Sequence, residues 1–220
     1  SITYTEQKKP KGLPDAFLIG EKFIGNGNVA LILGDNFFYA QSLTKKLKEC
    51  VKLNKGATVI LHPVRNPSYY GIASINKRNK ITKIIEKPKK KISNLAVTGL
   101  YFFDNKVVEY SKKLRPSKRN ELEIVDLLNK YKKNNELNAQ FLGRGAAWLD
   151  TGSIKDFYDT SAFVSTLENR QGFKIACLEE IALNNKWINK KNIEIAIKFY
   201  GKCNYSQYLA TLIKKNHLNQ

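Results

Sequence analysis

Short apolar segments of strand character alternate with amphipathic helical segments along the first half of the chain, and this alternation limits the possible folds most strongly. The clearest strand signal is Val29–Leu33, a continuous apolar run that ends in Gly34-Asp35-Asn36. Such a run is typical of a buried parallel strand that enters a loop. Further strands are predicted over 2–5, 58–61, 96–103, 139–142 and 147–149, a hairpin over 71–75 and 81–85, and helices over 14–23, 42–53, 107–114 and 121–132.

The C-terminal part reads as helical. A long helix is predicted to begin at Ser153, where Asp156 completes a variant of the capping box, and to end at Gly172. From Leu178 onward the pattern stays helical, with breaks near 187–190 and 201–204. We therefore predict an α/β sheet domain over residues 1–172 and a helical extension over residues 173–220.

Composition narrows the class of protein. The net charge of +19 would suit a nucleic-acid binder, but the lysines are scattered in pairs and triplets along the chain. We favour solvated lysine-rich faces and predict no nucleic-acid partner. No apolar run approaches the roughly 20 residues that cross a bilayer, so no membrane contact is expected. The three cysteines lack metal-site spacing and are read as reduced thiols of a cytoplasmic protein.

Four segments place polar side chains where a predicted strand ends, which is the edge where α/β sheets bind ligands. Each has an ordinary structural explanation as well. Gln7 offers one donor and one acceptor that match a pyrimidine edge, but it also suits a solvated turn. Asp35 and Asp150 suit a cation site or helix and turn caps. Glu86 and Lys87 suit a sugar phosphate or a surface ion pair.

Taken together and in order, these segments form a more specific pattern. They are Glu6-Gln7 with Pro10 and Gly12-Leu13, then Leu33-Gly34-Asp35-Asn36, Tyr70-Gly71, Glu86-Lys87-Pro88, Val97-Thr98-Gly99-Leu100-Tyr101, Arg119 with Glu121-Leu122-Glu123, and Trp148-Leu149-Asp150-Thr151-Gly152. The set resembles the sugar nucleotidylyltransferases, and within them the glucose-1-phosphate thymidylyltransferases. The similarity runs from the first residue almost to the last.

The resemblance implies a Rossmann-like mixed sheet with flanking helices and a reaction that joins dTTP to glucose 1-phosphate. It implies that dTDP-glucose is made for deoxysugar, rhamnose and cell-surface polysaccharide synthesis. It also implies Mg²⁺, held by Asp35 and Asp150, and a homotetramer whose allosteric site would include Tyr39 and Arg144. Gln7, Gly12, Leu13 and Asp35 would bind the nucleotide; Tyr70, Gly71, Glu86, Lys87, Val97, Thr98, Arg119 and Trp148 would bind the sugar phosphate, with Lys87 and Arg119 acting in catalysis.

The sequence departs from the family pattern in two ways. Asn120 stands where the family usually has glycine. In addition, the family's Gly-x-Gly-Thr-Arg loop, which wraps the triphosphate, and the lysine beyond it do not occur in these residues. The sequence also contains no methionine. We therefore expect an N-terminally incomplete enzyme that lacks its first strand and is inactive by itself.

Two other functions stay open at this stage. One is a related nucleotidylyltransferase that uses UTP. The other, from a different class, is a non-catalytic basic module that binds phosphate or nucleic acid, for which the charge of +19 is the only support.

Overall fold

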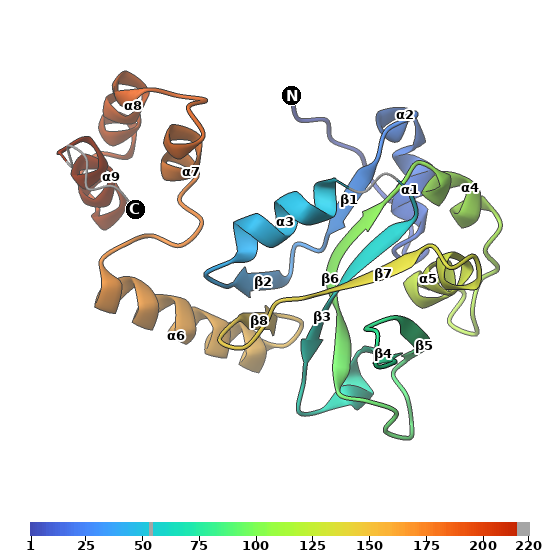
Figure 1. The fold of residues 1–220 in the computed structure, drawn as a ribbon. Helices are drawn as coiled ribbons and strands as arrows, with labels where there is room; N and C mark the ends of the chain where they lie inside the picture. Colours follow the sequence, from blue (N-terminus) through green and yellow to red (C-terminus); the bar gives the residue numbers. More distant parts are fainter. Residues whose placement is uncertain (53–54, 215–220) are drawn as a thin grey trace. The chain divides into compact units, whose positions relative to one another are not determined.

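A computed structural model describes residues 1–52 and 55–214 (Figure 1). The chain divides into two compact units, Ser1–Asp150 and Thr151–Gln220. Helix α6 (Ile154–Gln171) thus belongs to the second unit by its contacts. The sequence placed the domain boundary after residue 172 and so assigned this helix to the sheet domain. That boundary between folding domains stays a prediction.

A mixed sheet forms the centre of the first unit, as the α/β prediction requires. Among the described residues its strands follow the order β5-β4-β6-β3-β7, and β1 pairs with β6. Only β3 and β7 run parallel; the other pairs are antiparallel. The strands are β1 (Val29–Ile32), β3 (Ala57–Pro63), β4 (Gly71–Ile75), β5 (Ile81–Glu86), β6 (Leu95–Phe103) and β7 (Leu137–Phe141).

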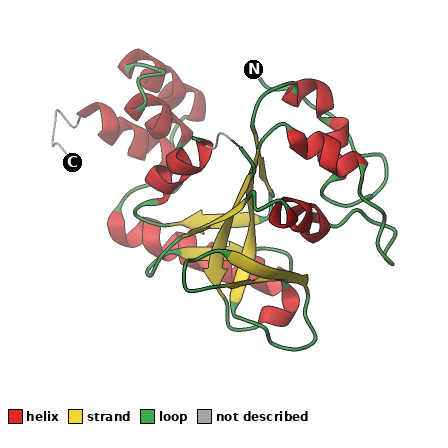
Figure 2. Cartoon of the chain, turned by 45° about the vertical axis from the view of Figure 1, so that its right-hand side comes forward, coloured by secondary structure: helices red, strands yellow, loops and turns green. Residues whose placement is uncertain are grey.

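One face of this sheet packs against helices. The helices are α1 (Asp15–Ile19), α2 (Glu21–Ile24), α4 (Lys106–Lys112) and α5 (Ile124–Lys133), seen beside the sheet in Figures 1 and 2. Phe17 of α1 meets Phe103 of β6 edge to face, with ring centroids 5.2 Å apart. The rest of the contact is apolar, which is what fixes these amphipathic helices on the sheet.

The opposite face is covered by α3 (Leu43–Val51) and by a small separate ribbon, in which β2 (Asn36–Tyr39) pairs antiparallel with β8 (Ala147–Asp150). Cys50 of α3 and Trp148 of β8 are buried on this face with Ile60 of β3 and Leu100 of β6. The ribbon is therefore anchored to the main sheet through its side chains. It ends in Asp150, one of the two acidic residues predicted to bind a cation, and the other, Asp35, directly precedes β2.

Two strand predictions were wrong. Val29–Leu33 was expected to be a buried parallel strand, but β1 is antiparallel to β6 and alternates half-buried and exposed side chains. The direction of a strand relative to its neighbour, here β6, cannot be inferred from an apolar run alone. Residues 2–5 were expected to form a strand, yet they form no regular structure and their side chains are exposed. An extended segment becomes a strand only with a partner, and the structure pairs none of the described strands with it.

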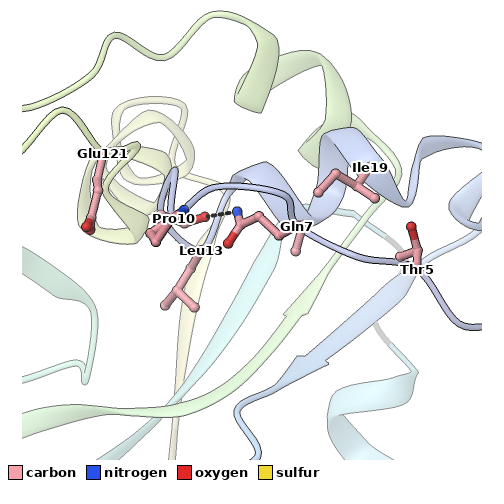
Figure 3. Close-up of a pocket in the computed structure, with 8 residues that line it drawn as sticks. Thr5, Gln7, Pro10, Leu13, Ile19 and Glu121 are labelled. Atoms are coloured by element: carbon pink, nitrogen blue, oxygen red, sulfur yellow. Dashed lines mark hydrogen bonds between the residues drawn. The ribbon is translucent and has the colours of Figure 1, made fainter.

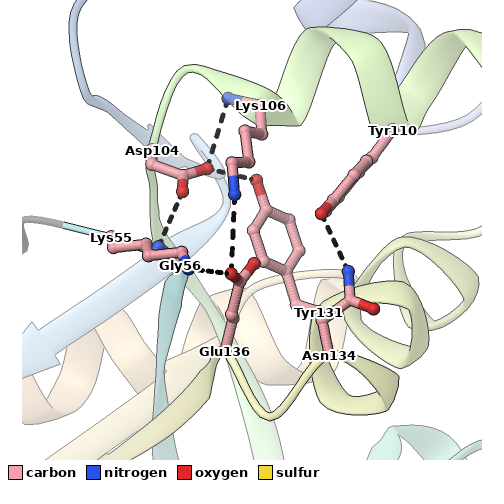
Figure 4. Close-up of polar contacts among 8 residues, drawn as sticks. All are labelled: Lys55, Gly56, Asp104, Lys106, Tyr110, Tyr131, Asn134 and Glu136. Carbon is pink, nitrogen blue, oxygen red and sulfur yellow. Dashed lines mark hydrogen bonds and ion pairs between the residues drawn. The ribbon is translucent and has the colours of Figure 1, made fainter.

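A buried polar network closes the far end of the sheet (Figure 4). The Asp104 carboxylate accepts hydrogen bonds from the backbone N–H of Gly56 at 2.7 Å and from the Tyr131 hydroxyl at 2.8 Å. Nearby, Glu136 pairs with Lys55 at 2.8 Å and Lys106 at 3.5 Å. Because every buried carboxylate needs such partners, the network ties the starts of β3 and β7 to α4 and α5.

The second unit is helical, as predicted. It contains α6, α7 (Leu178–Asn184), α8 (Lys190–Tyr200) and α9 (Asn204–Lys214), and the last three share a core around Cys177, Ile193 and Leu209. The predicted start of α6 is confirmed: the Ser153 hydroxyl accepts from the Asp156 N–H at 3.1 Å. Gly172 ends the helix in the left-handed conformation. None of the described helices is long and apolar enough to cross a membrane.

Candidate active site

The ribbon of β2 and β8 brings together two acidic residues from motifs far apart in sequence. The strands are in register so that Asn36 lies opposite Asp150, and Asp35 directly precedes Asn36. Cα atoms of such partners lie about 4.5–5.5 Å apart, so the two carboxylates come from adjacent backbone positions at one end of the ribbon. Two carboxylates with room for substrate oxygens are a donor set that suits Mg²⁺.

Asn36 is a residue whose importance the sequence did not reveal. Its Oδ1 accepts from the indole Nε1 of Trp148 at 2.6 Å and from the backbone N–H of Gly99 at 3.0 Å. Its Nδ2 donates to Asp35 Oδ1 at 2.8 Å. The only signal in the sequence was its place beside Asp35. Trp148 itself is buried and lies 5.1 Å from the Tyr70 ring, so these two predicted sugar-pocket residues do lie together.

A second group of predicted residues gathers where the β4–β5 hairpin ends. Gly71 lies opposite Glu86 in the ladder, and a Cβ at Gly71 would come within 3.1 Å of Glu86 Oε2. Burial raises the pKa of Glu86, and the positive charges of Lys87 and Arg119 partly oppose that shift. The backbone of Lys87 is left-handed, with φ 42°, and its N–H donates to the Tyr70 carbonyl at 3.0 Å. The Glu86 carboxylate is therefore partly buried and lies within electrostatic range of two cations.

Arg119 is held by a neighbour on its own segment. Its Nε and Nη2 donate to the two carboxylate oxygens of Glu123 at 3.2 Å and 2.7 Å. Ser117 donates to the same carboxylate at 2.6 Å. Glu123 was quoted only as part of a motif, but it orients the guanidinium in a bidentate pair. The charges of Arg119 and Lys87 lower the pKa of Glu86, while the charge of Glu123 raises it, so two cations and two carboxylates act on one another here.

Strand β6 carries two predicted sugar-pocket residues, Val97 and Thr98, and a third residue near the site, Tyr101. Thr98 is fully buried and its hydroxyl donates to the Ile60 carbonyl at 3.0 Å, and Val97 is buried in the apolar core. Their predicted contacts with the sugar stay predictions. Tyr101, which was named only within its motif, is buried next to the site. Burial raises the pKa of its phenol, and the charges of Glu86 and Asp35 raise it further. Tyr101 thus lies within electrostatic reach of both the sugar-side and the cation-side carboxylates.

Three of the four predicted nucleotide residues line a pocket of about 410 Å³ in the first unit, and Asp35 is not among the residues that line it (Figure 3). Gln7, Gly12 and Leu13 are among its walls, together with Glu121. The Gln7 amide donates to Asp15 Oδ2 at 2.8 Å and to the Gly12 carbonyl at 3.3 Å, which fixes the amide at the pocket. The structure therefore brings the Gln7 segment together with the Arg119 segment, since Glu121 belongs to the latter.

Gly12 has a role beyond the expected approach to a base. Its φ is 90°, and a Cβ built on it would lie 2.0 Å from the Leu122 carbonyl oxygen. In return the Leu122 N–H donates to the Lys11 carbonyl at 2.8 Å. The loop that carries Gln7 and the loop that carries Arg119 are thus joined backbone to backbone.

Comparisons with known proteins show the family to which the chain is similar. A family model described as nucleotidyl transferase matches residues 1–166. A glucose-1-phosphate thymidylyltransferase of Neisseria meningitidis is 48% identical over 215 residues, which cover 98% of this chain and 75% of that protein. The enzyme of the same name from Mycobacterium tuberculosis is 39% identical and is covered to the same extent, 75%.

Solved structures give the same result. A glucose-1-phosphate thymidylyltransferase of Bacillus anthracis, solved with sucrose, superimposes with a TM-score of 0.66 at 38% identity, over 73% of this chain and 64% of that one. A UDP-glucose pyrophosphorylase solved with UDP-glucose gives a TM-score of 0.67 at 28% identity, over 74% and 66%. The chain thus spans about three quarters of the curated relatives and just under two thirds of the first of these structures.

Proposed function

Because the chain belongs to the nucleotidyl transferase family, we propose that it takes part in transferring a thymidylyl group from dTTP to glucose 1-phosphate, which yields dTDP-glucose and pyrophosphate. The observation that carries this proposal is the pairing of β2 with β8. It sets the acidic residues of two separate motifs side by side, next to the Trp148 and Tyr70 rings. The product would supply deoxysugar synthesis.

The chemistry asks the protein to position two anionic substrates and to offset their charge. A phosphate oxygen of glucose 1-phosphate attacks the α-phosphorus of dTTP, a new P–O bond forms, and the bond to the leaving pyrophosphate breaks. Gln7 would orient the base in its pocket, while Lys87 and Arg119 would bind the sugar phosphate and Glu86 a sugar hydroxyl. Mg²⁺, bound by Asp35 and Asp150, would supply positive charge for the phosphate oxygens.

The activity is best tested with a chimera. A segment that carries the family's Gly-x-Gly-Thr-Arg loop, taken from a nucleotidylyltransferase of the family, would be fused to Ser1. With dTTP, glucose 1-phosphate and Mg²⁺ the chimera should release pyrophosphate, and Asp150→Asn should abolish the release. A folded chimera that binds both substrates and forms no dTDP-glucose would contradict the proposal. Replacing dTTP by UTP tests the second candidate, which the UDP-glucose pyrophosphorylase structure supports.

The sugar-phosphate role of Arg119 needs its own test. In the same chimera Arg119→Ala should raise the KM for glucose 1-phosphate and leave that for dTTP nearly unchanged, because the charge of the guanidinium reaches Glu86, where the sugar is proposed to bind. Arg115→Ala, an exposed arginine of the same connection, is the matched control. An equal loss for both substrates would refute the assignment.

We also propose a cytoplasmic homotetramer. Large apolar side chains on α8 support an assembly, since Ile195 is 64% and Phe199 83% exposed. Light scattering of the chimera after size exclusion would measure the mass.

A further inference from the structure

The Asn36 side chain connects three parts of the fold at the candidate cation site. It stands at the start of β2 and reaches the backbone of β6 through Gly99, the indole of β8 through Trp148, and the carboxylate of its own neighbour Asp35. All three hydrogen bonds have lengths between 2.6 and 3.0 Å. One short amide in β2 therefore bonds to β6, to β8 and to the Asp35 carboxylate.

The partners determine which way the amide faces. Two N–H donors, from Gly99 and Trp148, point at one end of the group, and only a carbonyl oxygen can accept from both. The NH₂ end is thereby directed to Asp35, where it donates at 2.8 Å. A flipped amide would set its donors against two other donors, so the orientation is fixed by the network.

Gly99 makes room for this arrangement. A Cβ at Gly99 would lie 2.6 Å from both Cγ and Oδ1 of Asn36, far inside contact distance. Its φ is not in the left-handed region, so glycine is not required there by the backbone conformation. Glycine in the Val97–Tyr101 motif is instead explained by the Asn36 amide that lies over it.

We propose that Asn36 is a positioning residue that holds the Asp35 carboxylate in the orientation for divalent-cation binding, with Gly99 and Trp148 holding Asn36 in turn. The inference rests on the proposed function, which makes Asp35 a cation ligand. A carboxylate that is oriented in advance loses less freedom when a cation binds. Partners that orient metal ligands typically change metal affinity about 10–100-fold when they are replaced.

A purely structural role is the alternative: Asn36 would only tie β2 and β8 to the main sheet. Both roles predict lower stability for Asn36→Ala. Only the positioning role predicts weaker cation binding in a variant that stays folded.

The test is Mn²⁺ binding to the chimera, followed by the electron paramagnetic resonance signal of the free ion. We expect Asn36→Ala and Gly99→Ala each to weaken binding about 10-fold or more, with the fold checked by circular dichroism. Gly27→Ala is the matched control, because its Cβ would meet nothing closer than 3.4 Å. Wild-type affinity in both folded variants, together with loss of binding in Asp35→Asn, would overturn this inference alone. If Asp35→Asn and Asp150→Asn also bind Mn²⁺ like wild type, the proposed cation site itself falls, and this inference with it.

A measurement on the unsubstituted chimera covers the case in which both variants unfold. Trp148→Phe identifies the Trp148 indole N–H by the resonance that it removes. Because Asn36 links Asp35 to this indole, adding Mg²⁺ should shift the ¹H–¹⁵N resonance of the indole. The Mg²⁺ affinity obtained from this shift should equal the affinity with which Mg²⁺ displaces Mn²⁺. A resonance that stays still while the cation binds would contradict the proposal.

Discussion

At Gly12 two loops approach so closely that no side chain fits between them. A Cβ there would overlap the Leu122 carbonyl, and the φ of 90° is costly for any other residue. Gly12→Ala should lower the free energy of unfolding by about 1–3 kcal/mol, measured by denaturant titration. Gly27→Ala, whose Cβ lies 3.4 Å from the Ile24 carbonyl, should change it by no more than about 0.5 kcal/mol. Equal effects of the two changes would show that the close approach is not what requires glycine.

Two glutamates predict opposite pH dependences. Burial raises the pKa of Glu86 in the folded state above the value of about 4.3 that it has in the unfolded chain. As the pH rises above about 4.3, ionisation of Glu86 therefore lowers the free energy of unfolding. The hydrogen bond from Lys55 lowers the folded-state pKa of Glu136, so its ionised form contributes stability that is lost as pH falls through the lowered value. Glu86→Gln should therefore be more stable than wild type at pH 7, and Glu136→Gln less stable.

Urea titrations of the chimera from pH 3 to pH 8 measure both effects. The Glu86→Gln difference should disappear below about pH 4, where the carboxyl is protonated in either state. The Glu136→Gln difference should shrink only at still lower pH. Shifts of the same sign in the two variants would show that burial does not govern Glu86.

Among the elements, α6 depends on its ends. Only Thr160 is buried along its 18 residues, so tertiary packing contributes little and the caps matter more. Ser153→Ala removes the bond to the Asp156 N–H and should lower stability by about 1 kcal/mol. Ser161→Ala is the control: its exposed hydroxyl bonds only the Phe157 carbonyl one turn back, and alanine is the better helix former. Thermal unfolding that ranks the two variants the other way would contradict the argument.

The elements also show what sequence can predict. The caps at Ser153 and Gly172 and the hairpin over 71–86 follow from neighbouring residues, and they were predicted correctly. The direction of β1 depends on β6, which lies far along the chain, and it was predicted wrongly. The candidate site divides in the same way. Asp35 and Asp150 stand out in local motifs, whereas the role of Asn36 depends on Gly99 and Trp148, 63 and 112 residues away.

For the whole chain, the edge of β1 determines solution behaviour. Among the described residues β1 pairs with β6 alone, and Ile32 on this strand is 60% exposed. Backbone groups on such an exposed edge can pair with a strand of another chain, which favours association. We expect the 220 residues alone to associate or to unfold without a sharp transition, and to make no dTDP-glucose.

Thermal scans, light scattering and the pyrophosphate assay test this expectation together. The chimera should melt more cooperatively than the 220-residue chain, and Ile32→Lys should reduce association, because a charge on an open edge disfavours strand addition. A sharp transition and measurable turnover in the 220-residue chain would show that the Gly-rich loop is dispensable.

The register of β2 with β8 also has a consequence for the time course of synthesis. Asn36 leaves the ribosome early, but its partner Trp148 follows 112 residues later. Most of the main sheet can pair in the meantime. Strand β1 precedes β2 in the sequence, and β3, β4, β5 and β6 lie between β2 and β8. Pairings this remote in sequence close late, since the loop entropy has to be offset by structure already formed. A nascent chain therefore acquires its core first, and the acidic pair meets only after almost all of the sheet has been made.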